Sequence, residues 1–204
     1  MKNINEITAS HHSNKTGFSR HYLTLYSIIL GMEAKNVFEF GSGFSSKTML
    51  LALEETGGKL ISCDYRPLSL TAKTYDGDSE EMTRLSERWR YIQKRSTGAL
   101  NDISGEIFDV VLHDGSHTWT EVADDLGKII PYMKKGGILM VHDTNHPTDN
   151  YQLDKSVDAI DFSCSDSGYD IERLTLPYGY GLTIIRVMQD FGNGEVNIAW
   201  RKGQ

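Results

Sequence analysis

The chain alternates short, largely apolar runs with longer stretches in which apolar residues recur at helical spacing. Short apolar runs bounded by turn residues are typical of strands that are buried on both faces. The pattern predicts strands of this kind over residues 36–40, 59–63, 89–93, 108–112 and 138–141. Because helical segments lie between these runs, their order predicts a parallel sheet covered by helices.

The sequence predicts helices between the strands, more strongly in some segments than in others. Apolar side chains at helical spacing predict helices over 18–32 and 118–130, and Gly57 ends the helix that follows the first strand. The polar stretch 66–88 is expected to be helical, with weaker periodicity. Residues 134–137, Lys-Lys-Gly-Gly, are expected to form a turn into the fifth strand.

The C-terminal part departs from the strand–helix alternation. Two strand-like segments, 171–176 and 182–187, are separated by Pro177 and a glycine-rich turn. Two strands joined by so short a turn form an antiparallel hairpin. The predicted fold class is therefore α/β: a doubly wound, Rossmann-like, mostly parallel seven-stranded sheet with an antiparallel C-terminal hairpin.

No repeat, low-complexity tract or linker divides the 204 residues, so residues 1–204 are predicted to form a single domain. Residues 1–17 form a polar leader. Residues 145–165, after the fifth strand, form a polar insertion that is placed to cover a substrate.

Composition and charge exclude several kinds of protein. A net charge of −7 argues against a protein whose main affinity is for nucleic-acid phosphates. Nowhere do about 18 apolar residues run together as a membrane span requires. Cys63 and Cys164 have neither disulfide-framework nor metal-site spacing. With no apolar signal-peptide core at the start, the expectation is a cytoplasmic protein; its oligomeric state, a homo-oligomer included, stays open.

Polar residues gather where the predicted strands end. In a parallel sheet, ligands bind beyond the carboxyl ends of the strands. Asp64 follows the second strand, and the fourth and fifth strands are followed by His113-Asp114 and His142-Asp143. His113 lies within a strand end and is expected to be structural.

A glycine loop follows the first strand, with the sequence EFGSGFS from Glu39. It has two glycines of the pattern G-x-G-x-x-G but Ser46 in place of the third, so the dinucleotide fingerprint is incomplete. Gly41 and Gly43 let the backbone approach a ligand closely, while Ser45 and Ser46 are suited to cap the following helix. Asp64, at the end of the next strand, is suited to bind both hydroxyls of a ribose.

Four segments together resemble class I S-adenosylmethionine-dependent methyltransferases of the small O-methyltransferase group, which includes sugar and macrolide O-methyltransferases and cephalosporin-biosynthesis methyltransfer proteins. Residues 37–46, VFEFGSGFSS, resemble the first motif of that class, E/D-x-G-x-G-x-S. The other three segments are DVVLHDGSHT at 109–118, KKGGILMVHDT at 134–144 and GYGLTIIR at 179–186. Order and spacing agree over about residues 35–187, with Lys135 standing where proline is usual.

The resemblance implies a binding site for S-adenosylmethionine. Gly41 and Gly43 would lie under its methionine part, Glu39 would serve its amino end, Asp64 would hold the ribose hydroxyls, and Ser96 would contact the adenine edge. The full set of implied cofactor residues is Glu39, Gly41, Gly43, Ser45, Asp64, Ser96 and Asp114.

The expected chemistry is methyl transfer to a hydroxyl of a small, sugar-like molecule. A hydroxyl needs a base or a metal ion to become nucleophilic near neutral pH. We expect His117 to be that base, with Asp114 and Asp143 in catalytic roles. Asp114 and Asp143 end adjacent strands and would suit Mg²⁺, with His142 or Asn145 as the third ligand. The resemblance also implies a divalent metal at this place. The alternative for Asp114 is ordering its loop, and the alternative for His117 is an N-cap.

Two other functions stay open. A nucleotide-dependent oxidoreductase could share the sheet, although the missing third glycine and the C-terminal hairpin argue against it. A non-catalytic S-adenosylmethionine-binding partner protein would share nearly every cofactor residue named above.

Overall fold

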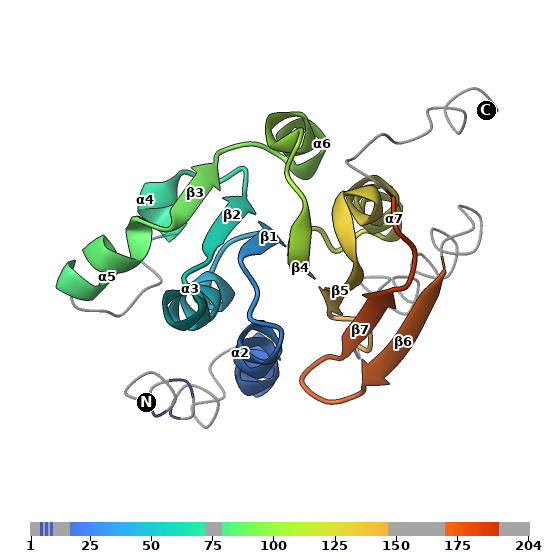
Figure 1. Cartoon of the computed structure of the whole chain (residues 1–204), viewed down its shortest axis with the longest axis horizontal. Helices are drawn as coiled ribbons and strands as arrows, with labels where there is room; N and C mark the ends of the chain where they lie inside the picture. The colour runs from blue at the N-terminus through green and yellow to red at the C-terminus, as the bar shows by residue number, and fades with distance from the viewer. Residues whose placement is uncertain are drawn as a thin grey trace.

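A seven-stranded mixed sheet runs through the computed structural model, which describes residues 5, 7, 9, 17–71, 79–146 and 170–191 (Figure 1). The strand order is β3-β2-β1-β4-β5-β7-β6. The first five strands pair in parallel, and β7 is antiparallel to both of its neighbours. The strands are β1 (Asn36–Phe40), β2 (Lys59–Cys63), β3 (Trp89–Ile92), β4 (Phe108–His113), β5 (Met133–His142), β6 (Ile171–Leu176) and β7 (Leu182–Val187). The predicted fold class is confirmed.

Helices cover both faces of the sheet, with α2 and α3 on one face and α6 and α7 on the other (Figure 1). The helices are η1 (Gly17–His21), α2 (Tyr22–Gly31), α3 (Phe44–Thr56), α4 (Leu68–Thr71), α5 (Ser79–Ser86), α6 (Ser96–Ala99), η3 (Leu100–Ile103), α7 (Trp119–Ile129) and η4 (Ile130–Tyr132). This layering explains why the strands read as continuous apolar runs, since both of their faces are buried.

Successive residues of a central strand belong to different cores. Val37 packs in the cluster beneath α2 and α3, whereas Phe38 packs in the cluster beneath α6 and α7. This is the two-residue period of a strand. The same alternation turns Glu39 toward α3, which is where its hydroxyl partners lie.

The structure corrects the prediction of a turn at residues 134–137. Strand β5 already begins at Met133, which pairs with Phe108, and the register shifts before Val110 pairs with Ile138. Gly136, with a φ of +81°, lies within this irregular stretch. The turn-like composition therefore marks a distortion inside a strand rather than its beginning.

Other boundaries agree closely with the prediction. Gly57 adopts a left-handed conformation with a φ of +71° and ends α3 by donating its N–H to the carbonyl of Leu53. The stretch 66–88 contains the short helices α4 and α5 in its described parts, and α6 was not predicted. The polar leader and the 145–165 insertion lie largely outside the described residues. None of the helices in the described part of the chain combines the length and the hydrophobicity of a membrane span.

Candidate active site

The loops that follow β1 and β4 meet in the middle of the sheet. Asp114 donates its backbone N–H to the carbonyl of Phe40 over 3.0 Å, and Gly41 donates its own to the carbonyl of Cys63 over 2.9 Å. Gly41 has a φ of +85°, and a Cβ there would lie 2.4 Å from the carbonyl oxygen of Asp114. Both the backbone conformation and the available space therefore require glycine at this position.

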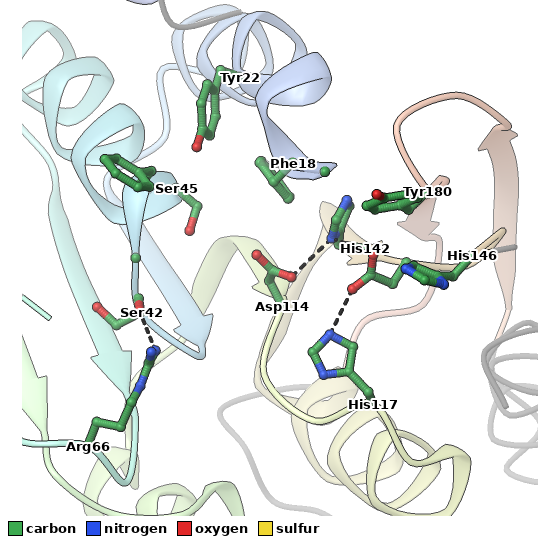
Figure 2. A pocket seen from close by; sticks show the side chains of 14 residues that line it. Phe18, Tyr22, Ser42, Ser45, Arg66, Asp114, His117, His142, His146 and Tyr180 are labelled. Carbon is green, nitrogen blue, oxygen red and sulfur yellow. Dashed lines mark hydrogen bonds and ion pairs between the residues drawn. The ribbon is translucent and has the colours of Figure 1, made fainter. Parts of the chain in front are cut away.

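A cavity of about 410 Å³ opens beyond this contact, at the carboxyl ends of the central strands (Figure 2). The chain connections that leave β1 and β4 run in opposite directions, and ligands bind at such switch points. Six of the predicted site residues line the cavity: Gly43, Ser45, Asp114, His117, His142 and Asp143.

Glu39 lies beneath the glycine loop and is not a lining residue. Its side chain is fully buried. Its Oε1 accepts a hydrogen bond from Ser45 over 2.6 Å, and its Oε2 accepts from Ser46 over 2.5 Å and from Ser62 over 2.7 Å. Burial raises the pKa of Glu39 to about 8, although the three hydroxyls oppose the rise. In the structure Glu39 therefore fixes the loop and α3 to the sheet. Its contact with a cofactor amine, which the resemblance implies, stays a prediction.

The first turn of α3 forms one wall of the cavity. The backbone N–H of Gly43 donates to Oγ of Ser46 over 3.2 Å, which is the capping role expected of this serine. A Cβ at Gly43 would meet no atom of the described residues within 4 Å. Packing inside the protein does not require glycine here, so Gly43 leaves open space at the helix N-terminus.

Asp64 lies at the end of β2, as predicted, and is 6% exposed. Its Oδ2 accepts a hydrogen bond from the backbone N–H of Ser42 over 3.1 Å. The guanidinium of Arg66 covers the same carboxylate, and Arg66 rather than Asp64 lines the cavity (Figure 2). Sequence reasoning missed Arg66, although an arginine two residues after an acid is a natural partner for it.

Ser96 is a predicted residue that the structure does not bring to the cavity. It begins α6, beyond the end of β3, and is half-buried. It does not belong to the lining of the cavity.

His142 lies between two carboxylates at the ends of β4 and β5. Its Nδ1 lies 3.1 Å from Oδ1 of Asp114 and 3.2 Å from Oδ1 of Asp143, and its Nε2 lies 3.0 Å from the carbonyl oxygen of Gly179. A carbonyl only accepts, so Nε2 carries a proton, and Nδ1 donates to the carboxylates. Burial lowers the pKa of His142, but the two carboxylates outweigh it and raise the pKa to about 10. His142 is therefore an imidazolium.

His117 approaches the same cluster from the loop before α7 (Figure 2). Its Nε2 lies 2.8 Å from Oδ2 of Asp143, and this hydrogen bond raises the pKa of His117 against the opposing effect of burial. Burial also opposes the ionised form of Asp143, yet the hydrogen bonds from His117 and His142 hold its pKa well below the usual range. Asp143 has a φ of +61°, a strained conformation of the kind that collects at functional sites.

Two further histidines near the cluster are buried and structural. His113 lies 3.1 Å from Asp125, which agrees with the structural role expected for it. His21 was not predicted to take part in the site. Its Nε2 donates to the carbonyl of Gly179 over 3.2 Å, and burial together with nearby His142 lowers its pKa to about 4. His21 is thus a neutral link between η1 and the β6–β7 turn.

Aromatic rings form the wall of the cavity opposite α3. Phe18, whose ring centroid lies 4.7 Å from that of His142, and Tyr22 come from η1 and α2. Tyr180 comes from the β6–β7 turn, and its ring centroid lies 4.3 Å from that of His146. Sequence reasoning predicted the first helix but not its place here, because helical periodicity does not show which edge of a sheet a helix covers.

Asp114, His117 and Asp143 offer atoms that could hold a metal ion, all within 4.8 Å of one another. The predicted ligand set contained His142 in place of His117. In the structure both ring nitrogens of His142 are hydrogen-bond donors, so His142 has no lone pair for a metal. One imidazole and two carboxylates suit Mn²⁺ or Zn²⁺ as well as Mg²⁺, which prefers oxygen ligands.

The strand order, the glycine loop after β1 and the acid after β2 agree with the Rossmann-like fold predicted from the sequence. A family model described as "Methyltransferase domain" matches residues 38–144, which is more than half of the chain. The chain belongs to this family. Membership excludes the oxidoreductase alternative. Among curated proteins, no match is found.

Solved structures share the fold over most of the chain. Cofactor-bound Rv0187 from MTB aligns with a TM-score of 0.70 at 13% identity, covering 93% of this chain and 91% of that one. An O-methyltransferase from Bacillus cereus in complex with SAH aligns with a TM-score of 0.67 at 11% identity, covering 92% of this chain and 91% of that one. The O-methyltransferase TomG from Streptomyces achromogenes, in complex with SAM, aligns with a TM-score of 0.64 at 13% identity, covering 84% of this chain and 81% of that one. At these identities the likeness shows the fold.

The buried position of Glu39 predicts a pH-dependent stability. Its pKa is about 8 in the folded protein and near 4.5 in the unfolded chain. Between these values the unfolded chain releases the proton that the folded protein keeps, so the free energy of unfolding falls as pH rises, by at most about 1.4 kcal/mol per pH unit from one group. Urea denaturation between pH 5 and pH 8 should show a flatter slope for Glu39→Gln than for wild type. Glu172→Gln, at an exposed glutamate, is the control; equal slopes in wild type and Glu39→Gln would contradict the prediction.

Proposed function

We propose that the protein transfers a methyl group from S-adenosylmethionine to a hydroxyl of a small, sugar-like molecule. The observation that carries the proposal is the cavity between the ends of β1 and β4, where the glycine loop and Asp114 come together. The carboxylate of Asp64 is hydrogen-bonded to this loop and is covered by Arg66. When bound, S-adenosylmethionine supplies the methyl group from its sulfonium centre. O-methyltransferases in complex with SAM or SAH share the fold, which supports both the cofactor and an oxygen acceptor.

Residues at the ends of β1, β2 and β4 would hold the cofactor. Asp64 has two carboxylate oxygens for the vicinal hydroxyls of a ribose. Gly43 leaves open space beside α3, and the negative charge of Asp114 on the cavity favours a cationic ligand. Ser96, at the start of α6, is our candidate for the adenine edge.

The remaining part of the cavity would hold the acceptor. It combines the rings of Phe18, Tyr22 and Tyr180 with the polar side chains of His117 and His146. Rings that pack against an apolar face, together with groups that bind hydroxyls, suit a small polyhydroxylated molecule. This mixture supports a small acceptor better than a macromolecule.

His117 would accept the proton of the acceptor hydroxyl. Asp143 holds Nε2 of its ring, so the proton would be taken at Nδ1, the nitrogen that does not face Asp143. A carboxylate that orients an imidazole and stabilises its charged form is the arrangement found in other acid–base sites. The side chain of His117 is 41% exposed, which lets it reach a ligand in the cavity.

A divalent cation is the second candidate for activating the hydroxyl. Asp114, His117 and Asp143 would hold it, and the ion would lower the pKa of the bound hydroxyl. In that arrangement Nε2 of His117 would face the ion, so His117 would be a ligand rather than the base. The two mechanisms therefore make opposite predictions about metal removal.

Asp64→Asn should weaken binding of S-adenosylmethionine. The amide keeps the size of the side chain but replaces one acceptor oxygen with a donor, which should raise Kd on the order of tenfold to a hundredfold. Isothermal titration calorimetry measures the change. Asp102→Asn, at a surface acid paired with Lys94, is the matched control. No binding by the wild type would refute the cofactor assignment.

His117→Ala should abolish turnover and leave cofactor affinity unchanged. Loss of a general base costs about 10²-fold to 10⁴-fold in rate. The assay follows transfer of a labelled methyl group to a panel of sugars, glycosides and phenols, and calorimetry with S-adenosylmethionine serves as its control. Unchanged turnover in the variant would refute the base. Intact cofactor binding with no turnover by the wild type on any acceptor would favour the non-catalytic partner protein.

Removal of divalent cations separates the base from the metal mechanism. If His117 is the base, dialysis against a chelator leaves the rate of methyl transfer unchanged. If a cation activates the hydroxyl, the rate falls after dialysis and returns when Mg²⁺ or Mn²⁺ is added. We expect the first result, because His142 already places a positive charge between the two carboxylates.

A further inference from the structure

The guanidinium of Arg66 is bound to the carboxylate that would hold the cofactor ribose. Nη2 of Arg66 lies 2.6 Å from Oδ2 of Asp64, and Nε lies 3.1 Å from each carboxylate oxygen. Nη2 also donates to the backbone carbonyl of Ser42 over 2.8 Å, so the side chain spans from the end of β2 to the glycine loop (Figure 2).

Together with two backbone donors, these bonds fill the carboxylate of Asp64. The backbone N–H groups of Ser42 and Arg66 donate to it over 3.1 Å and 2.9 Å. A carboxylate has about four lone-pair sites. The two vicinal hydroxyls of a ribose would need sites that the guanidinium now occupies, so both cannot bind Asp64 in this arrangement.

Arg66 has the freedom to leave while its backbone stays in place. The hydroxyl of Tyr91 donates to the carbonyl of Arg66 over 2.6 Å and ties that part of the chain to β3. The side chain of Arg66 is 44% exposed, whereas that of Asp64 is 4% exposed. The guanidinium can therefore turn into solvent, where it is fully hydrated, but the carboxylate cannot.

We propose that Arg66 is an internal competitor of the cofactor ribose and so determines the affinity of this site for ligands with a vicinal diol. The proposal rests on the proposed function, since it takes Asp64 as the ribose acceptor. In the ligand-free protein the guanidinium of Arg66 pairs with the buried carboxylate of Asp64, which would destabilise the folded protein if it had no partner. Binding exchanges this ion pair for two hydroxyl donors, and the exchange lowers the net affinity.

Arg66→Met tests the competition, because methionine keeps an aliphatic stem and removes every donor. Calorimetry with S-adenosylhomocysteine should give a Kd lower than that of the wild type by on the order of tenfold, the amount expected for a partly exposed charge-assisted pair. The ligand-free variant should also melt at a lower temperature, because Asp64 loses its partner. Arg186→Met, at a half-exposed arginine paired with Glu172 at the opposite end of the sheet, should match the wild type in affinity.

Salt gives a second, independent measurement. Between about 0.1 M and about 1 M salt the screening length falls from about 10 Å to about 3 Å, which weakens the pair between Asp64 and Arg66. The affinity of the wild type should therefore rise with salt relative to that of Arg66→Met. If Arg66→Met fails to fold, the same salt series on the wild type and Arg66→Lys, which cannot form the bidentate pair, carries the test.

The outcomes distinguish this proposal from the proposed function. Equal or weaker binding by Arg66→Met, with normal binding by the wild type, overturns the competitor and leaves the cofactor assignment intact. If neither the wild type nor the variants Arg66→Met and Arg66→Lys bind S-adenosylhomocysteine, the cofactor assignment is overturned, and the proposed competition with it.

Discussion

The close contact between Gly41 and the backbone of Asp114 is the constraint on which the site depends. Because β1 and β4 are neighbours in a parallel sheet, the loops after them leave through the same narrow space. A side chain at position 41 would push the β4 loop away, since its Cβ would lie 2.4 Å from the carbonyl oxygen of Asp114. A Cβ at Gly115 would also be crowded, since it would lie 3.2 Å from the amide nitrogen of Gly41. This contact brings the first turn of α3 and the carboxylate of Asp114 to one cavity.

The acids around this cavity are each stabilised in a different way. Glu39 is surrounded by hydroxyls, Asp64 is paired with a guanidinium, and Asp143 accepts from two imidazoles. Buried carboxyl groups are costly unless hydrogen-bonded or paired, so each of these arrangements fixes a neighbouring loop or strand end. Asp114 has the most accessible side chain of the four, at 25% exposed. Asp114 therefore presents the most accessible carboxylate to the cavity, whereas Asp64 is covered by Arg66 and Glu39 lies beneath the glycine loop.

The sequence predicted the sheet well and the pairing of side chains poorly. Strands such as β1 and β2 were predicted to the residue because burial on both faces leaves an unbroken apolar run. Residues 134–137 were misjudged because the start of β5 is held by backbone pairing and needs no apolar side chains. Residues at strand ends could be named from their place in the sequence. The sequence did not predict which of these residues would contact one another. The hydrogen bonds of Glu39 and His117 depend on distances across strands, which periodicity does not encode.

The charges in the cluster favour the base mechanism over the metal. Two carboxylates, Asp114 and Asp143, and one imidazolium, His142, leave one net negative charge when His117 is neutral. That charge would stabilise a cationic ligand in the cavity and, in the proposed mechanism, the imidazolium formed when His117 accepts a proton. A divalent ion would reverse the sign of the cluster and place positive charge beside a sulfonium. It would also require His117 to turn its Nε2 from Asp143 to the ion, removing the bond that orients the ring. His142 therefore already places a positive charge beside the two carboxylates and leaves the bond between His117 and Asp143 intact.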